Sequence, residues 1–196
     1  MGSLLATFSA ALEARDPYLR GHSARVTNFA ESLARLLGWA GDRLDVLRLG
    51  GSLHDVGKIS INASVLRKAG PLTEEELDQI RRHPVTGARL VECFEDFQAA
   101  LPYVLHHPER WDGSGYPHGL EGETIPFEAR LLGVVDAFDA MTSRRAYRPA
   151  LSVEQALGEL TRCAGSQFDP ELALTFVDGW AGGEIEPADR PLRLAI

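Results

Sequence analysis

Apolar residues recur every three or four positions along most of the chain, and this spacing is typical of amphipathic helices. One apolar stripe covers residues 26–37 and stops at Gly38, and a second covers residues 42–53. Because a helix that buries one face repeats with this period, each stripe predicts one helix.

Local signals at two other places predict where helices begin. Thr73 is followed three residues later by Glu76, and Ser152 is followed by Gln155 in the same way. This spacing predicts a capping box, in which each side chain binds the backbone N–H group of the other residue.

Two further helix starts are marked by proline. Pro170 follows Asp169, and proline suits the first turn of a helix. The notable β-branched cluster, Val134-Val135, lies inside a run that also reads as a helix beginning near Pro126. Strand signals are otherwise almost absent, so we predict an all-α fold.

Residues 108–126 interrupt the helical pattern with a long loop of functional character. Its helix-breaking residues are Gly113, Gly115, Pro117, Gly119 and Gly122. The tail at residues 183–196 has little periodicity and is expected to pack loosely. We predict one domain over residues 1–196, with its core at about 16–178.

Composition excludes several classes of protein. No apolar run approaches the roughly 20 residues of a membrane helix, and the N-terminus lacks a secretory signal, so we expect a cytoplasmic protein. A net charge of −8 argues against binding a nucleic acid polymer. Cys93 and Cys163 stand far apart without a Cys-x-x-Cys pattern, so we expect two core residues and no thiolate metal site.

The dipeptide His54-Asp55 is the strongest local chemical signal. It ends the apolar helix at residues 42–53, and Gly57 supplies a bend that lets both side chains serve one cluster. A carboxylate can bridge two cations, and neutral imidazole suits iron, manganese, zinc or nickel. Lys58 adds a cation suited to a phosphate oxygen. The alternative is a helix end with a histidine near its dipole.

The other candidate histidines favour the metal interpretation, because they too stand beside helix ends or breaks. These residues are His22 after Gly21, His83 before Pro84, and His106-His107 before Pro108.

Asp136 and Asp139 form a second signal within an otherwise apolar segment. Their i, i+3 spacing places both carboxylates on one helix face. Buried carboxylates need cations, and we expect a metal for Asp136 more than for Asp139. The alternative is an ion pair with one of three arginines, Arg130, Arg144 or Arg145.

Several motifs in order together resemble the HD-GYP domain family, the branch of the HD superfamily associated with cyclic di-GMP phosphodiesterases. The match runs from about Asp16 to Phe176. Its main segments are Gly21-His22-Ser23, Leu53-His54-Asp55-Val56-Gly57-Lys58, His83-Pro84-Val85-Thr86-Gly87, Glu109-Arg110-Trp111-Asp112-Gly113-Ser114-Gly115-Tyr116-Pro117, Asp136-Ala137-Phe138-Asp139 and Arg145-Ala146-Tyr147-Arg148.

The resemblance implies an HD-domain helical bundle with additional C-terminal helices and a long Gly/Pro-rich loop. It also implies two divalent transition metal ions, iron or manganese before zinc or nickel, with Asp55 as the bridge. The metal ligands it implies are His22, His54, Asp55, His83, His106 or His107, and Asp136. The substrate contacts it implies are Lys58, Arg145, Arg148 and the loop residues Gly115, Tyr116 and Pro117.

The sequence departs from the family pattern at two positions. Tyr18 stands where members with a third metal carry glutamate, which favours two metals. Pro108 stands where the family has the second histidine of a pair, so an ungapped match gives His107 the first place and leaves the second without a ligand.

The reaction implied is hydrolysis of cyclic di-GMP to pGpG, GMP or both, by a hydroxide shared between two metals, with Asp55 and Lys58 as catalytic residues. One alternative is an impaired module that binds cyclic di-GMP, or binds a diguanylate cyclase through the loop at residues 115–117. Another is an HD phosphohydrolase that acts on a different nucleotide.

Overall fold

The computed structural model describes residues 2–144 and 149–186, and the regular structure in these ranges is helical. The α-helices are α1 (Gly2–Arg15), α2 (His22–Leu36), α3 (Asp42–Leu53), α4 (Ala63–Leu66), α5 (Glu74–Arg81), α6 (His83–Glu92), α7 (Leu101–His106), α8 (Phe127–Thr142), α9 (Val153–Arg162) and α10 (Pro170–Ala181). Four 3-10 helices join them: η1 (Pro17–Leu19), η2 (Val56–Ser60), η3 (Glu95–Ala100) and η4 (Gly122–Thr124). The predicted all-α fold is confirmed.

The helices begin where the local signals predicted. Thr73 and Ser152 each complete a capping box, at the starts of α5 and α9. The Asp169 side chain accepts the backbone N–H groups of Glu171 and Leu172 at the start of α10. These contacts involve residues close in sequence, so a short window contains the information that determines them.

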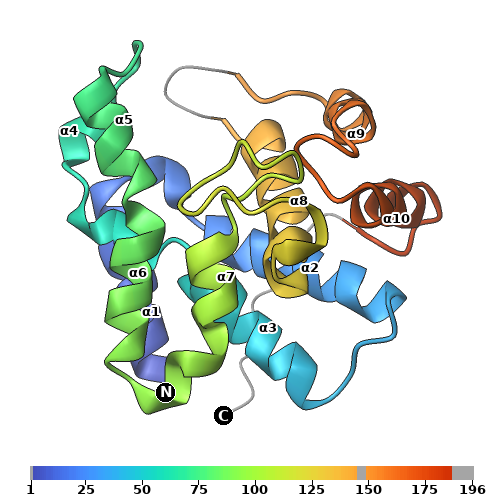
Figure 1. The fold of residues 1–196 in the computed structure, drawn as a ribbon, viewed down its shortest axis with the longest axis horizontal. Helices are drawn as coiled ribbons and strands as arrows, with labels where there is room; N and C mark the ends of the chain where they lie inside the picture. The colour runs from blue at the N-terminus through green and yellow to red at the C-terminus, as the bar shows by residue number, and fades with distance from the viewer. Residues whose placement is uncertain (1, 145–148, 187–196) are drawn as a thin grey trace.

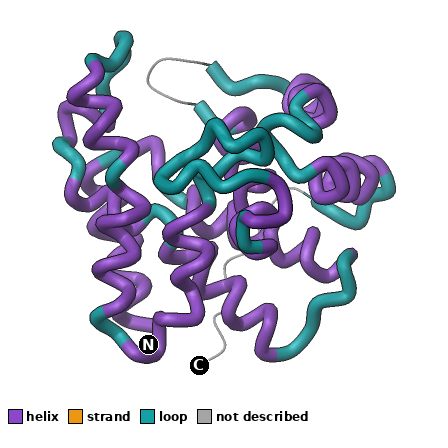
Figure 2. The backbone as a smooth tube through the Cα atoms, in the orientation of Figure 1, coloured by secondary structure: helices purple, strands orange, loops and turns teal. Residues whose placement is uncertain are grey.

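The helices lie in two groups with α7 between them (Figure 1). On one side are α1, α5 and α6, and on the other are α8, α9 and α10. Helix α2 packs against α3, α8 and α10, while α7 packs against α3, α6 and α8. The loop at residues 108–126 crosses the helices in this view (Figure 2), and it contains η4 and one isolated β-bridge between Asp112 and Glu121.

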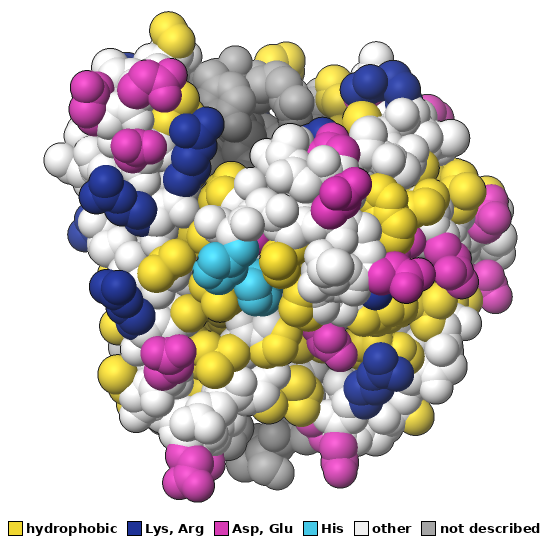
Figure 3. Space-filling view, in the orientation of Figure 1, with side chains coloured by type: hydrophobic (Ala, Val, Ile, Leu, Met, Phe, Trp, Pro, Cys, Tyr) yellow, Lys and Arg dark blue, Asp and Glu magenta, His cyan; other side chains and the backbone are white. Residues whose placement is uncertain are grey.

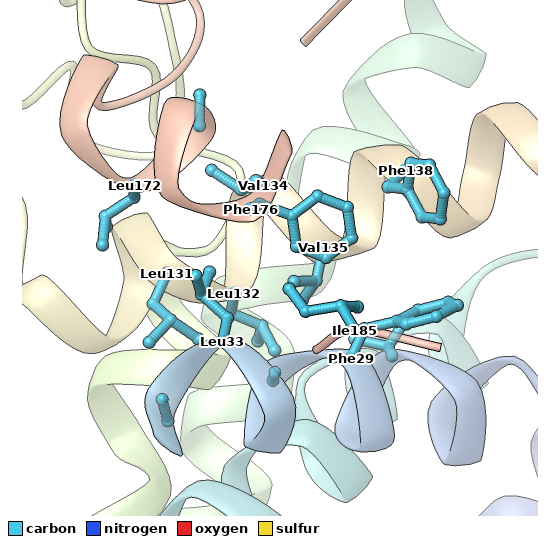
Figure 4. Close-up of a cluster of buried hydrophobic side chains, with 14 of the residues drawn as sticks. Phe29, Leu33, Leu131, Leu132, Val134, Val135, Phe138, Leu172, Phe176 and Ile185 are labelled. Carbon is cyan, nitrogen blue, oxygen red and sulfur yellow. The ribbon is translucent and has the colours of Figure 1, made fainter. Parts of the chain in front are cut away.

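Two apolar clusters form the interior. The larger cluster joins α2, α8, α9 and α10, and the rings of Phe29 and Phe138 meet edge to face within it at a centroid distance of 5.3 Å (Figure 4). The smaller cluster joins α1, α3, α6, η3 and α7. Helix α3 belongs to both, through Leu47 and Leu53. The candidate metal ligands come from helices of both clusters, so interior packing sets their separation.

Gly57 allows η2 to lie directly on α6. A Cβ atom at this position would collide with the backbone of His83 and of Gly87. The sequence predicted a bend at Gly57, and the structure adds close packing as the reason for glycine. This packing holds Asp55, just before η2, next to His83 at the start of α6.

The cysteine prediction is wrong in part. Cys93 caps the end of α6 and is exposed, while Cys163 is half-buried. Cys93 lies where α6 reaches the surface, a placement that depends on packing and not on local pattern. Among the described helices, none has the length and apolar character needed to cross a membrane. That residues 1–196 form one domain stays a prediction.

Candidate metal centre

Asp55 lies at the centre of four buried imidazole rings. Its Oδ2 atom is 3.5 Å from Nε2 of His22 and 3.5 Å from Nε2 of His54. Its Oδ1 atom is 3.5 Å from Nε2 of His83 and 3.8 Å from Nε2 of His107. Each carboxylate oxygen therefore faces two imidazoles, and the centre divides into a His22 side and a His83 side.

Asp136 completes the His22 side. Its Oδ1 atom is 3.3 Å from Nε2 of His22 and 4.0 Å from Nε2 of His54. The His22 side thus has two imidazoles and Asp136, the His83 side has the imidazoles of His83 and His107, and both share Asp55.

The outer nitrogen of each imidazole is held by an acceptor. Nδ1 lies 2.8 Å from the Gly51 carbonyl in His54, 2.7 Å from the Ile80 carbonyl in His83, and 3.1 Å from the Tyr103 carbonyl in His107. A carbonyl oxygen only accepts, so Nδ1 carries the hydrogen in these three rings. In the neutral ring Nε2 then has a lone pair directed at Asp55, which is the tautomer a metal ligand needs.

Unsatisfied polar atoms also fit a metal. Nε2 of His22, Nε2 of His54 and Oδ1 of Asp55 are buried and have no hydrogen-bond partner among the described residues. Nε2 of His83 lies 3.2 Å from Nε2 of His107, so at most one can donate to the other. Buried polar atoms without partners are costly, and imidazole nitrogens around a carboxylate are the donors that divalent transition metals use.

The His83 side is ready to bind a cation at neutral pH. Burial, together with the positive charge of Lys58, lowers the pKa of His83 to about 4. Burial, together with neighbouring His54, lowers the pKa of His107 to about 3. Both rings are therefore neutral near pH 7 and can donate their lone pairs.

The His22 side binds a proton instead. Burial acts to lower the pKa of His22, but the surrounding carboxylates of Asp136, Asp139 and Asp55 outweigh it and raise the pKa to about 10. The pKa of Asp136 falls below its usual value despite burial, because His22 contacts it. A metal ion on this side must replace the His22 proton.

Asp139 positions His22 and lies outside the set of residues around Asp55. Its Oδ2 atom is 2.7 Å from Nδ1 of His22, and its Oδ1 atom accepts from Nε of Arg25 at 2.6 Å. Among the described residues, the cation that pairs with Asp139 is thus Arg25, whereas the sequence suggested Arg130, Arg144 or Arg145, the last of which lies outside the described residues. Sequence reasoning missed Arg25, although it follows His22 by three residues and so lies on the same helix face.

Arg130 has a different partner from the one the sequence suggested. Its Nη1 atom donates to Asp169 at 2.6 Å, linking α8 to the start of α10. Asp139 pairs instead with a residue far away in sequence, and only the packing of α2 on α8 brings the two together.

Lys58 contacts the centre directly. Its Nζ atom is 2.7 Å from Oδ2 of Asp55, and 23% of its side chain is exposed. Burial acts to raise the pKa of Asp55, but the positive charge of Lys58 and the neighbouring histidines lower it well below its usual value. Lys58 therefore balances the bridging carboxylate and reaches the solvent from the same position.

Comparison with known proteins identifies the family. The HD domain family profile matches residues 6–172. This chain belongs to the HD domain family. It is 38% identical over 179 residues to the "Cyclic di-GMP phosphodiesterase response regulator RpfG" of Xanthomonas campestris pv. campestris, covering 90% of this chain and 47% of that relative.

The chain is also similar to a second curated relative and to a solved structure. The chain is 35% identical to "3'3'-cGAMP-specific phosphodiesterase 2" of Vibrio cholerae, over 87% of this chain and 33% of the relative. The fold resembles that of Bd1817, a HDG"Y"P protein from Bdellovibrio bacteriovorus, with a TM-score of 0.66, 22% identity and coverage of 82% of this chain and 52% of that chain. The chain therefore spans about half or less of the length of these relatives. The HD-GYP resemblance is confirmed.

One histidine of the 106/107 pair faces this centre. His107 faces Asp55, whereas His106 turns away and lies near Glu109 and His118. Of the two alternatives that the sequence left open, His107 lies at this centre and His106 lies outside it. Consecutive residues on a helix point about 100° apart, so α7 directs one of the two rings inward.

We call the group formed by His22, His54, Asp55, His83, His107 and Asp136 the HD centre. A cavity of about 340 Å³ borders it at His107 and Asp136, and its lining also includes Pro108, Trp111 and Tyr116. The Tyr116 ring lies 6.4 Å from the His83 ring. Of the predicted loop contacts, Tyr116 thus lies beside the centre.

The other predicted substrate contacts are not shown to line the cavity. Gly115 packs against the backbone of Glu109 and Arg110, where a side chain would not fit. Pro117 is half-buried. Arg145 and Arg148 lie outside the described residues, as does the side chain of Tyr18.

Proposed function

We propose that this HD domain is a metal-dependent phosphodiesterase that hydrolyses a cyclic dinucleotide, with cyclic di-GMP as the first candidate. The observation that carries the proposal is the division of four Nε2 atoms between the two oxygens of Asp55. Curated relatives named for cyclic di-GMP and 3'3'-cGAMP support the substrate class.

The donor set fits two divalent transition metal ions, with iron or manganese before zinc or nickel. His22, His54 and Asp136 would hold one ion, His83 and His107 the other, and Asp55 would bridge them. Such a pair lowers the pKa of water and balances charge on a phosphodiester.

The chain's own residues supply orientation and charge. The held Nδ1 atoms fix four imidazole rings before substrate arrives, which limits reorganisation during the reaction. Lys58 places a positive charge at the solvent side of Asp55, where it binds a phosphate oxygen. The adjoining cavity accepts part of the nucleotide, and Tyr116 forms its edge beside His83. Roles for Arg145 and Arg148 in holding phosphate, and a cytoplasmic location, belong to the same proposal.

Product analysis tests the proposal directly. The purified chain, loaded anaerobically with Fe(II) or with Mn(II), is incubated with cyclic di-GMP, 3'3'-cGAMP and cyclic di-AMP, and products are separated by chromatography. We expect pGpG or GMP from cyclic di-GMP, and no product after chelation. If loaded protein leaves all three nucleotides intact while a curated relative cleaves its own substrate, the catalytic proposal is wrong.

Pro108 favours a second candidate, a domain that binds the nucleotide without cleaving it. The His83 side has two imidazoles and Asp55, because proline cannot supply the further ligand that the family pattern has. Bound metal and bound cyclic di-GMP without product would support this candidate.

A diguanylate cyclase is the partner proposed for residues 115–117. The test is whether this chain captures a purified diguanylate cyclase, and the Tyr116→Ala variant is expected to lose that binding.

A further inference from the structure

A second group of metal-binding side chains lies outside the HD centre, where α7 meets the loop. We call His106, Glu109 and His118 the α7–loop cluster. Their ligand atoms lie within 4.8 Å of one another. Nδ1 of His106 is 3.9 Å from Oε1 of Glu109, and the His106 and His118 rings are 5.3 Å apart. We propose that this cluster binds one divalent cation of the zinc, cobalt or nickel type, separately from the HD centre.

The His106 nitrogen lacks any other partner among the described residues. Nδ1 is buried, and it makes no hydrogen bond with the described part of the chain. Its distance of 3.9 Å from Glu109 is too long for a hydrogen bond. A buried ring nitrogen directed at a carboxylate without bonding to it is well placed to share an ion with that carboxylate.

Glu109 is held in place for this role. Its side chain has 0% exposure, and its oxygens accept the backbone N–H groups of His118 at 2.8 Å and of Leu120 at 3.1 Å. Each carboxylate oxygen has two acceptor positions, so one remains on Oε1 after the His118 bond. The carboxylate is therefore fixed in orientation and still able to bind an ion.

The spacing suits a tetrahedral ion. Zinc bonds to nitrogen and oxygen of about 2.0–2.2 Å place neighbouring ligands roughly 3.3–3.6 Å apart. The observed 3.9 Å needs a small closure, and the exposed His118 ring is able to turn. Histidine atoms lie at the surface near the middle of the face in Figure 3. His118 is exposed, so an ion has access to the cluster from solvent. Two imidazoles and a carboxylate leave a fourth position for water.

An ion at this cluster would fasten the loop to α7. His106 ends α7 directly before His107 of the HD centre, and His118 lies two residues after Tyr116, which lies beside His83. Occupancy would therefore fix the loop segment that borders the cavity. The inference rests on these contacts and is independent of whether the HD centre hydrolyses a nucleotide.

Metal counting with cobalt tests the inference. The native chain and three variants, His118→Gln, His106→Gln and Glu123→Gln, are dialysed against Co(II), and bound metal per chain is measured with the visible absorption of the ion. Glu123 is an exposed acid of the same loop outside the cluster, so its variant is the matched control. We expect one ion fewer in each histidine variant and the native number in Glu123→Gln. Equal numbers in all four proteins would overturn the inference.

A second pair of measurements separates this site from the HD centre. In an Asp55→Asn background, which removes the carboxylate shared by both sides of the centre, one Co(II) ion should remain and His118→Gln should remove it. Zinc should also slow chemical modification of the exposed His118 ring by diethyl pyrocarbonate. Modification at the same rate with and without zinc contradicts the inference, and circular dichroism verifies that each variant is folded.

Discussion

The HD centre and the α7–loop cluster use the same donor types in different settings. At the HD centre, imidazoles from four separate segments meet one buried carboxylate, and each outer nitrogen has an acceptor. In the α7–loop cluster, three residues within one short stretch meet, Glu109 is buried, and the His118 ring is exposed. The difference shows that the HD centre depends on the whole fold, whereas the cluster depends on how one loop folds back on α7.

This difference affects how protons and metals compete. At the HD centre, neighbouring carboxylates raise the pKa of His22 to about 10 against the effect of burial, whereas burial lowers the pKa of His107 to about 3. Two histidines of one site thus differ in protonation before any metal arrives.

The largest effect is expected from Asp55→Asn. It removes the charge shared by both sides of the HD centre, so phosphodiesterase activity should fall by about 10³-fold or more, equivalent to several kcal/mol of lost stabilisation. Metal analysis should show loss from the HD centre while the α7–loop cluster still binds Co(II). Asp178→Asn, an exposed carboxylate on α10, is the control, and comparable activity of the two variants would contradict the role of Asp55.

Lys58→Met should lower kcat by about 10²-fold, because it removes one positive charge that acts on the phosphate. The Nζ atom contacts Oδ2 of Asp55 as a charged ammonium group and has no lone pair for a metal, so metal content should stay at the native number. Lys68→Met, a surface lysine paired with Glu76, serves as control. Loss of metal together with activity would show that Lys58 instead stabilises the centre itself.

Asp139→Asn should weaken metal binding on the His22 side by about 10–100-fold, as expected for a residue that orients a ligand histidine. The fixed orientation of His22 depends on this carboxylate, which Arg25 holds in turn. Titration with Co(II) should show the weaker site, with binding at the α7–loop cluster unchanged. An unchanged affinity at the HD centre would mean that packing alone orients His22.

The smallest effect is a proton released on metal binding. Because the His22 pKa is raised to about 10, a metal on this side displaces about one proton at neutral pH, and its affinity should rise about tenfold from pH 7 to pH 8. His83, with a pKa of about 4, releases none. Calorimetry in two buffers of different ionisation enthalpy counts the protons, and a count of zero would refute the raised pKa.

The same proton affects the stability of the metal-free protein. A raised folded-state pKa adds stability that is complete below the ordinary histidine pKa of 6.5 and is lost as pH rises through about 10. Thermal unfolding of the chelated native protein and of chelated Asp139→Asn is measured between pH 6 and pH 10. The unfolding temperature should decline less with rising pH in the variant.

Local sequence determined much of the helical framework. Thr73, Ser152 and Asp169 mark helix starts because their capping partners lie two or three residues away. The sequence also indicated imidazole and carboxylate as the metal ligands, because several histidines stand beside helix ends and an acidic pair in an apolar segment needs a cation. The order of the sequence motifs indicated the HD domain family.

Tertiary structure alone decided which of these residues meet. His22 and Asp139 are 117 residues apart in sequence, and only the packing of α2 on α8 brings them together. The same packing assigns Arg25 to Asp139, and the direction of α7 sends His107 inward and His106 toward the loop. Short-range hydrogen bonds are encoded within a few residues, whereas a buried centre depends on helices whose separation the whole core fixes.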